Sequence, residues 1–337
     1  MPNRRLLSTS GQTAAMQHLR ISSPSSLTDE VLAMLGADRA VTNLTCVRGA
    51  CLDPALEPIG DLVEADIARE GADDALVRLH TLGVHQLGTI HLTPVPTWLS
   101  RTGRKAETVT PGASADTVIW ADVTQRAYEE SEPNWTYFTF MILATLIASI
   151  AIVLDSQVLV IGAMVLGPEF LPIAALGLAL VRRRRMLFWY AGRTLVLGFL
   201  AAIATATAAA LLGRALGWID VGAITAARPE TSFIYRPDRW SLLVAVVAAI
   251  AGVLSLTSAK VGGLSGVFIS VTTIPAAGNI ALGLALGAGD EVRGGALQLT
   301  VNICGMAVAG WLTLAVKQVV STHMSAHPRR LRPTFEQ

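Results

Sequence analysis

The sequence predicts an α-helical polytopic membrane protein with six spans, arranged as a 3+3 inverted repeat, together with an N-terminal α+β ferredoxin-like domain. The first observation is composition: the chain is 52% hydrophobic and only 15% charged, whereas soluble proteins are about 25% charged. The apolar runs lie in residues 135–320, which we assign to the membrane domain. The second observation is a repeat: the string Ala-Leu-Gly-Leu-Ala-Leu stands at 175–180 and again at 281–286.

The third observation is a proline in the middle of the apolar run before each copy, Pro172 in the first and Pro275 in the second. Each copy falls in the second of three consecutive membrane-length segments. A repeat with an odd number of spans enters the membrane in the opposite orientation the second time. Inverted repeats with interrupted helices near the bilayer centre are a common plan of secondary transporters. We therefore expect a proline-broken second helix in each half.

In the N-terminal part of the chain, the sequence predicts disorder over residues 1–15 and a cytoplasmic ferredoxin-like domain over 16–95. The expected order is strand, helix, strand, strand, helix, strand, which is the split βαβ plan. Strands are expected at Met16–Ile21, Val41–Arg48, Asp61–Arg69 and Leu87–Leu92. Helices are expected from Ser26, capped with Asp29, to Gly36 and from Asp73 to Gly83.

Residues 96–134 connect this domain to the membrane domain. Two prolines, two glycines and three basic residues predict a linker over 96–113. Ala115–Ser131 predicts an amphipathic helix, because Ile119, Val123 and Ala127 fall on one side. That helix either lies on the membrane surface or simply connects the two domains, and the sequence favours neither role.

Six segments are long and apolar enough to cross a bilayer, since a spanning helix needs about 20 such residues. They are Trp135–Leu154, Val158–Val181, Met186–Leu212, Ser241–Thr257, Val261–Gly287 and Ala296–Val320. Basic residues gather in one set of loops, above all Arg182–Arg185, with Lys260 and the 321–337 tail on the same side. The positive-inside rule therefore predicts a multi-pass protein of the prokaryotic cytoplasmic (inner) membrane with both termini, and the soluble domain, in the cytoplasm. The long loop 213–240 falls outside although it contains four arginines, which conflicts with that rule.

The strongest candidate for a functional site is the segment that contains Gly167, Pro168, Glu169 and Pro172. Each proline removes a backbone donor, so we expect the helix to kink or unwind here. A carboxylate at the bilayer centre costs at least ~2.5 kcal/mol and usually faces a cavity or a partner. Glu169 is therefore expected on an ion pathway, and the alternative is a structural pair with Arg193.

The matching segment of the second repeat supplies Thr272, Thr273, Pro275 and Asn279, and Asn302 in the last span is expected to line the same cavity. Hydroxyls, an amide, a carboxylate and unwound carbonyls are hard oxygen ligands that suit small cations or protons. The alternative for the threonines is close helix packing by small polar residues, and for Asn302 interhelical hydrogen bonding.

Several function classes are excluded by what the sequence lacks. It has no phosphate-binding loop, nucleophile elbow or zinc motif, so an ATP-driven pump and an enzyme are disfavoured and no cofactor is expected. The three cysteines and six histidines show no metal spacing. A formal net charge of +1 gives no reason to expect nucleic acid as a partner.

The segment Val160–Pro172 resembles the signature of a hydrophobic bacterial and archaeal family called domain of unknown function 389, as does the stretch from Leu242 to Asn302. The resemblance covers residues 135 to about 320, and a small α/β domain before it is common in that family. Family members usually carry serine or alanine before the first proline and a Met-Gly pair before the second. This chain has Gly167 and Phe170-Leu171 at those positions, with Glu169 inserted in the polar role. The family implies no settled activity.

These features predict a membrane channel or secondary transporter for a small ion or solute, with its site at the bilayer midplane between the repeats. The alternative is a membrane-anchored sensor or scaffold whose soluble domain binds a ligand or partner. Besides the lipid bilayer and the solute, the expected partner is a further copy of the chain, because helices rich in Gly, Ala and Ser pack closely between subunits.

Overall fold

The computed structural model describes residues 16–52, 59–110, 118–225, 228–231, 234, 239–257 and 273–324. The chain divides into two compact units, one mainly of residues before Thr124 and one mainly of residues after it. Several predictions fall wholly or partly outside the described residues: the disorder of 1–15, the place of Lys260, the position of Thr272, the first part of the predicted fifth span, and the tail beyond Met324.

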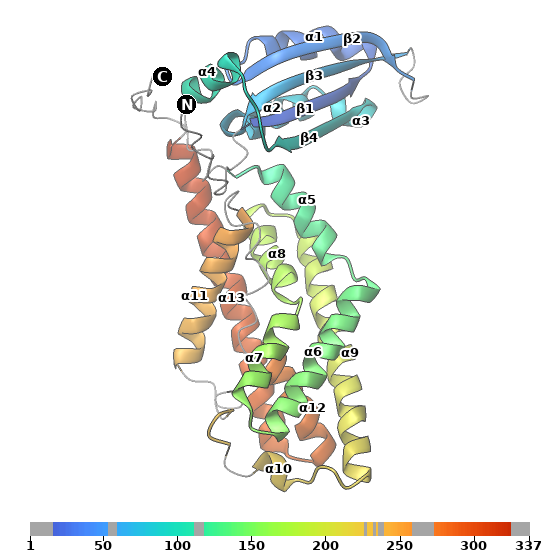
Figure 1. Ribbon diagram of the computed structural model, residues 1–337, viewed down its shortest axis with the longest axis vertical. Coiled ribbons are helices and arrows are strands. Elements are labelled where there is room, and N and C mark those ends of the chain that lie inside the picture. The colour runs from blue at the N-terminus through green and yellow to red at the C-terminus, as the bar shows by residue number, and fades with distance from the viewer. Residues whose placement is uncertain are drawn as a thin grey trace, which may run out of the picture. The chain divides into compact units, whose positions relative to one another are not determined.

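The N-terminal unit is built on a four-stranded sheet with the order β2-β3-β1-β4, in which all neighbouring strands are antiparallel (Figure 1). Its elements are β1 (Met16–Ser23), α1 (Ser25–Gly36), β2 (Val41–Cys51), β3 (Gly60–Ala68), α2 (Arg69–Thr81), α3 (Val84–Leu87) and β4 (Thr89–Val95). Alternate residues of β1 and β3 are buried, including Leu19 and Ile21 of β1, which pack with Val63, Val31 and Leu79. The predicted succession of strands and helices is present, and the four-residue helix α3 is added to it.

Two predicted helix starts in this unit are wrong. α1 begins at Ser25 behind Pro24, and no side chain caps it. Asp29 cannot serve the expected cap, because its carboxylate accepts a 2.6 Å hydrogen bond from Arg48. α2 begins at Arg69, four residues before Asp73, because β3 passes directly into it through Ala68.

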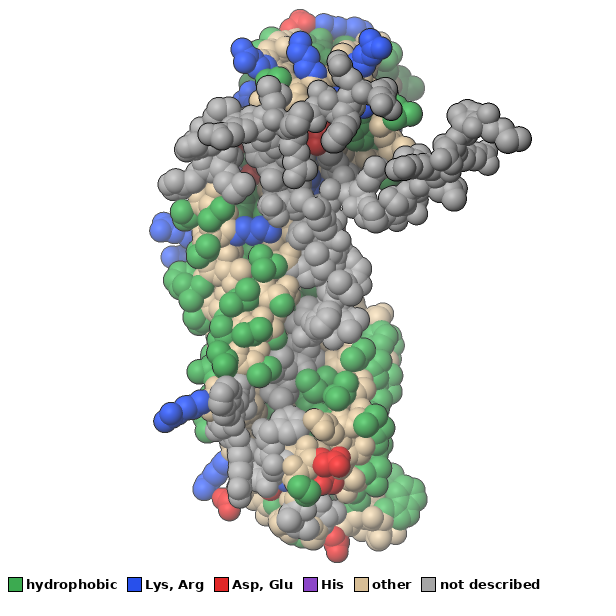
Figure 2. Space-filling view, turned by 60° about the vertical axis from the view of Figure 1, so that its left-hand side comes forward, with side chains coloured by type: hydrophobic (Ala, Val, Ile, Leu, Met, Phe, Trp, Pro, Cys, Tyr) green, Lys and Arg blue, Asp and Glu red, His purple; other side chains and the backbone are tan. Residues whose placement is uncertain are grey.

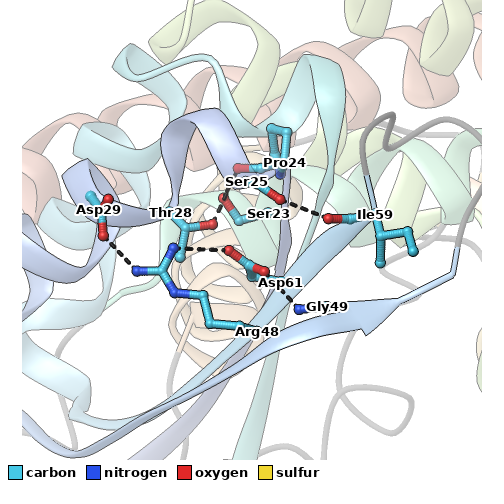
Figure 3. A network of polar contacts seen from close by, with 9 residues as sticks. All are labelled: Ser23, Pro24, Ser25, Thr28, Asp29, Arg48, Gly49, Ile59 and Asp61. Carbon is cyan, nitrogen blue, oxygen red and sulfur yellow. Dashed lines mark hydrogen bonds and ion pairs between the residues drawn. The ribbon is translucent and has the colours of Figure 1, made fainter.

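A polar network around Asp61 ties β2 and β3 to α1 (Figure 3). The Asp61 carboxylate accepts hydrogen bonds from the Gly49 N–H at 2.8 Å and from Arg48 at 3.3 Å. Burial alone would raise the pKa of Asp61, but the hydrogen bonds from Gly49, Thr28 and Arg48 outweigh it and lower that pKa. Gly49 has a φ of 69° at the point where the register of β2 shifts, so the buried carboxylate fixes this irregular part of the strand.

The predicted linker contains a helix, α4 (Arg101–Val109), which is capped by the Ser100 hydroxyl accepting from the Gly103 N–H. The predicted amphipathic helix is α5 (Trp120–Ser131); it begins at Trp120, not at Ala115. Trp98 and Ile119 pack on a second apolar cluster of the sheet that includes Met16 and Ile67. Residues after the predicted boundary at 95 therefore complete the core of the N-terminal unit.

The second unit is helical. Its elements are α6 (Trp135–Val153), α7 (Gln157–Leu166), α8 (Phe170–Val181), α9 (Arg185–Ala215), α10 (Gly222–Thr225), α11 (Arg239–Thr257), α12 (Thr273–Leu286) and α13 (Gly289–Met324). Among the described residues, three helices are long and apolar enough to cross a membrane: α6, α9 and α13. α7 and α8 together make a fourth candidate, bent by 55° at the break between them.

These long apolar helices are compatible with a membrane protein. α11 corresponds to the predicted fourth span, and the apolar stretch within its described residues is Leu242–Leu254. Only α12 of the predicted fifth span lies in the described residues. Hydrophobic side chains spread over the outward face of α11 and α13 (Figure 2), as a helix surface in contact with lipid requires. Exposed members are Leu243, Val247, Leu254, Val308, Leu312 and Val316.

α12 and α8 are the inner helices of this unit. Thirteen of the fourteen residues of α12 are buried, and α9 holds two of its carbonyls: Thr207 donates to Ala281 and Arg214 donates to Ala285. α8 touches α13 so closely that a Cβ on Gly177 would stand 2.9 Å from the Trp311 amide nitrogen. Small residues therefore let the backbones of these helices meet.

The first prediction concerns the size of the N-terminal unit. A fragment of residues 16–123 is expected to unfold cooperatively. Its free energy of unfolding is expected to exceed that of a fragment of 16–95 by about 2 kcal/mol or more, because it retains the buried Ile119 and the packing of Trp98. Urea unfolding followed by circular dichroism measures the difference. Equal stability of the two fragments would show that residues 96–123 lie outside the core.

The second prediction concerns the α8–α13 contact. Gly177→Ala is expected to destabilise the protein in detergent by about 1–3 kcal/mol, because the new methyl group overlaps the Trp311 backbone. Gly162→Ala on α7 is the matched control, since a Cβ added to Gly162 would meet no atom within 4 Å. The control is expected to leave thermal unfolding unchanged or to raise its midpoint slightly. Equal behaviour of the two variants would contradict the close packing.

Candidate functional site

The helix break predicted from the prolines is present at residues 167–169, between α7 and α8. Pro168 lies in the break itself. Pro172 is the third residue of α8, and a proline is tolerated in a first turn because the N–H it lacks has no helical acceptor there. Pro168 therefore marks the interruption, and Pro172 begins the helix that follows.

Glu169 lies at the start of α8 with only 1% of its surface exposed. Its Oε1 accepts a 2.6 Å hydrogen bond from the Thr273 hydroxyl, which is fully buried at the first position of α12. The structure thus joins the two segments that the sequence singled out, 104 residues apart. The alternative pair with Arg193 is not formed: Arg193 is exposed on α9.

Gly167 makes room for this carboxylate. A Cβ at position 167 would stand 2.2 Å from Glu169 Oε2 and 2.7 Å from Cγ1 of Ile274. Both distances are far below a normal contact. The φ of Gly167 is −71°, so close approach, and not backbone conformation, accounts for the glycine.

Asn302 is fully buried on α13, and two helix contacts place it at the level of Glu169 and Thr273. Gly295 of α13 packs on Ala276 and Ile280 of the antiparallel α12, while Gly177 of α8 packs further along α13 on Ala307 and Trp311. On α13, Asn302 lies between these two contacts. Following α12 from its contact with Gly295, and α8 from its contact with Ala307, back towards their first residues leads to the part of α13 that contains Asn302.

Together with Glu169 and Thr273, the buried side chains of Asn302 and Gln298 on α13 make up what we call the polar line inside the bundle. Gln298, one turn before Asn302, is fully buried and donates to Asn302 Oδ1 at 3.5 Å. Pro275 is buried in the first turn of α12. Of the predicted site residues, Gly167, Glu169 and Thr273 are therefore in contact, and Asn302 lies at their level.

Asn279 takes part in a second polar cluster nearer the α12–α13 turn. Its Oδ1 accepts from Arg228 Nη1 at 3.3 Å, and its Nδ2 donates to Glu291 Oε2 at 2.9 Å and to the Glu291 carbonyl at 3.0 Å. Arg228 Nη2 also forms a 2.9 Å ion pair with Glu291. Exposure is 3% for Arg228 and 9% for Glu291, so this ion pair is desolvated on both sides.

The sequence did not identify Arg228 or Glu291 as site residues. Both look like loop charges, and Arg228 is one of the four arginines whose place in loop 213–240 conflicts with the positive-inside rule. That conflict is the feature of the sequence that could have revealed the pair, because an arginine that breaks the charge rule is a candidate for burial with an acid. Arg214, another of the four, donates to the Ala285 carbonyl at 3.0 Å.

The two clusters each contain a buried carboxylate. Arg228 forms an ion pair with Glu291. Glu169 accepts a hydrogen bond from the neutral hydroxyl of Thr273, and the N-terminal end of α8 adds a field that favours the anion. A carboxylate, a hydroxyl and two side-chain amides along one buried line can exchange protons or coordinate a small cation. Within the described residues, no three Asp, Glu, His or Cys side chains cluster as a metal site.

The third prediction tests the buried ion pair. Arg228→Gln is expected to destabilise the protein by about 3–5 kcal/mol, because it leaves the Glu291 carboxylate buried without its cation. The double variant Arg228→Gln/Glu291→Gln is expected to recover most of that loss. Thermal unfolding in detergent measures the cycle, with Arg214→Gln, which loses one bond to a carbonyl, as a control costing about 1 kcal/mol. A double variant less stable than Arg228→Gln would rule out the proposed coupling.

Comparison with known proteins agrees with the resemblance seen in the sequence. The chain matches no curated protein and no solved structure. The model of a family described as a domain of unknown function, DUF389, matches residues 164–308, the part of the chain that contains the helix break, both polar clusters and Asn302.

Proposed function

We propose that the protein is a membrane channel or secondary transporter for a small ion or solute, and that Glu169 is the central residue of its pathway. The observation that carries the proposal is the buried hydrogen bond between Glu169 and Thr273 at a break in a candidate span. A carboxylate at such depth is costly, and it persists where it serves a pathway or a partner.

A structural role alone explains these features less well. A membrane-anchored sensor or scaffold, the alternative function, needs neither a broken helix nor an acid inside the bundle. The polar line through Gln298 and Asn302 likewise adds desolvation cost without adding apolar packing. An enzyme is disfavoured because the sequence contains no nucleophile elbow, phosphate-binding loop or zinc motif.

The proposal includes six spans in two inverted halves, and the element lengths support it. α6 and α11 each have 19 residues. α8 and α12 each carry a proline at the third position, Pro172 and Pro275. α8 is followed by Arg183, whose φ is 52°, and then by the 31-residue α9. α12 is followed by Gly287, whose φ is 77°, and then by the 36-residue α13.

The order β2-β3-β1-β4 and the antiparallel pairing support the proposed ferredoxin-like fold of the N-terminal unit. We further propose that this unit and both termini are cytoplasmic at a prokaryotic inner membrane, and that the protein forms homo-oligomers. The burial of Arg228 supports this topology, because a buried and paired arginine no longer counts as a free loop charge.

The fourth prediction concerns Glu169. Glu169→Gln is expected to change ion selectivity or the pH dependence of flux in proteoliposomes, because it removes the charge and keeps the size of the side chain. Assembly is expected to stay intact, since the amide oxygen still accepts from Thr273. Asp290→Asn, an exposed acid at the start of α13, is the matched control and is expected to leave flux unchanged. Flux screens over cations, anions and small metabolites provide the measurement, and wild-type behaviour of a well-folded Glu169→Gln protein would remove Glu169 from the mechanism.

A further inference from the structure

The inward face of α6 carries two hydroxyl groups that the polar line does not include. The exposed fraction is 6% for Tyr137 and 0% for Thr145, and both belong to the buried side of the helix together with Met141 and Ala148. The two residues are separated by a rise of about 12 Å along α6. Neither hydroxyl has a hydrogen-bond partner among the residues that the structure describes.

Other hydroxyls on these helices do find an acceptor. Thr139, Thr205 and Thr300 each donate to the carbonyl four residues earlier, at 2.9, 2.8 and 2.8 Å. Thr145 does not, and a buried hydroxyl without a partner carries the full cost of its desolvation. Phenylalanine and valine would fill the space of Tyr137 and Thr145 without that cost. Two such hydroxyls on one inward face therefore point to a ligand that hydroxyl oxygens can bind.

Thr145 lies beside the first turn of α12. A Cβ on Gly278 of α12 would stand 3.1 Å from the Ser149 amide nitrogen of α6. About one turn further along each helix, Leu282 and Ile152 belong to one apolar cluster, so the two helices run in the same direction. Thr145 is one turn nearer the start of α6 than Ser149, whose hydroxyl donates to the Thr145 carbonyl at 2.9 Å. It is therefore level with the start of α12 and with the hydrogen-bonded carboxylate of the polar line.

Tyr137 lies about two turns nearer the start of α6 than Thr145. Its ring packs on α9 at Gly198, where an added Cβ would stand 2.7 Å from Cε1 and 3.0 Å from the hydroxyl oxygen of Tyr137. Among the described residues, Glu169 is the charged group whose field acts on this phenol. The Glu169 carboxylate therefore has one hydroxyl of α6 at its own level and a second one towards the start of that helix.

We propose that Tyr137, Glu169 and Thr145 form a proton path through the bundle, with water bridging the intervals, and that the transported species is the proton. Each hydroxyl accepts a proton on its lone pair and releases its own proton to the next oxygen, so it ends the passage unchanged. Glu169 takes up the proton as a carboxylic acid and releases it to become a carboxylate again. This inference rests on the proposed function, to which it adds a substrate and two residues.

The packing around Tyr137 favours a proton over a larger cation. The phenol lies directly against the α9 backbone at Gly198, which leaves little width beside the hydroxyl oxygen. Cations such as Ca²⁺ and Mg²⁺ take about six or more oxygen ligands at once, whereas a proton needs one acceptor at a time. A phenol, a carboxylate and an alcohol that follow one another along a helix supply one oxygen for each step of a proton.

Proton flux in proteoliposomes tests the path. With the membrane potential held at zero by potassium and valinomycin, an entrapped pH-sensitive dye reports proton entry down a pH gradient. Tyr137→Phe and Thr145→Val each remove one oxygen and keep the size of the side chain, so each is expected to lower proton flux about ten-fold or more. Tyr190→Phe and Thr205→Val remove exposed hydroxyls of α9 and are expected to match the wild type.

Thermal unfolding in detergent distinguishes a path from a structural role of the two hydroxyls. Because neither hydroxyl has a partner among the described residues, Tyr137→Phe and Thr145→Val are both expected to unfold at the wild-type temperature or above it. A lower unfolding temperature for both variants would give the hydroxyls a structural role and overturn the proposal. Wild-type proton flux in the two well-folded variants would overturn it as well.

Infrared spectroscopy separates this inference from the proposed function. A pH step applied to the full-length protein is expected to produce a carboxyl band that Glu169→Gln abolishes and that forms more slowly in Tyr137→Phe. That result without ion flux in the wild type would support proton access to Glu169 and contradict transport. Potassium or chloride flux without proton flux, or a band that forms equally fast in Tyr137→Phe, would contradict the proton path and not transport.

Discussion

The burial of one carboxylate constrains the rest of the helical unit. Glu169 has 1% of its surface exposed, so its charge requires a partner and a local field that together offset desolvation. The break at Pro168 ends α7 and starts α8 at this point, which places the carboxylate at a helix N-terminus. α12 supplies the partner, Thr273, and must therefore lie deep in the bundle, where its small residues allow close contact with α6 and α13.

α12 connects the two polar clusters. Thr273 and Asn279 are six residues apart on it, a rise of about 9 Å. One cluster holds a carboxylate beside a neutral hydroxyl, and the other holds a carboxylate beside a guanidinium. A displacement of α12 along its axis would change both sets of contacts together, because a single rigid helix carries the threonine and the asparagine. The two polar clusters are thus mechanically linked.

Some features of the fold and of the candidate site could be predicted from the sequence, and physical reasons explain which features these are. The break follows from local chemistry, and so does the choice of Glu169 as a candidate, since a proline and an acid inside an apolar run are anomalies that need no partner to be noticed. The Arg228–Glu291 pair is not predictable in that way, because its members are 63 residues apart and each looks like an ordinary loop charge. The prediction of Asp29 as a cap is wrong because its true partner is Arg48. The local pattern predicts the strand that carries Arg48 but not which helix residue lies beside it. α4 escapes prediction because it is short and polar, and its buried face carries only the small residues Gly103 and Ala106.

The closeness of Gly167 to the Glu169 carboxylate has a consequence for related sequences. A methyl or hydroxymethyl group at position 167 would occupy the space of Glu169 Oε2, so serine or alanine there and glutamate two residues later exclude one another in this geometry. The two positions should therefore vary as a pair: chains with glutamate at 169 should keep glycine at 167, and chains with a larger residue at 167 should have a short or neutral side chain at 169. In such chains the hydroxyl that corresponds to Thr273 would have to find a different acceptor.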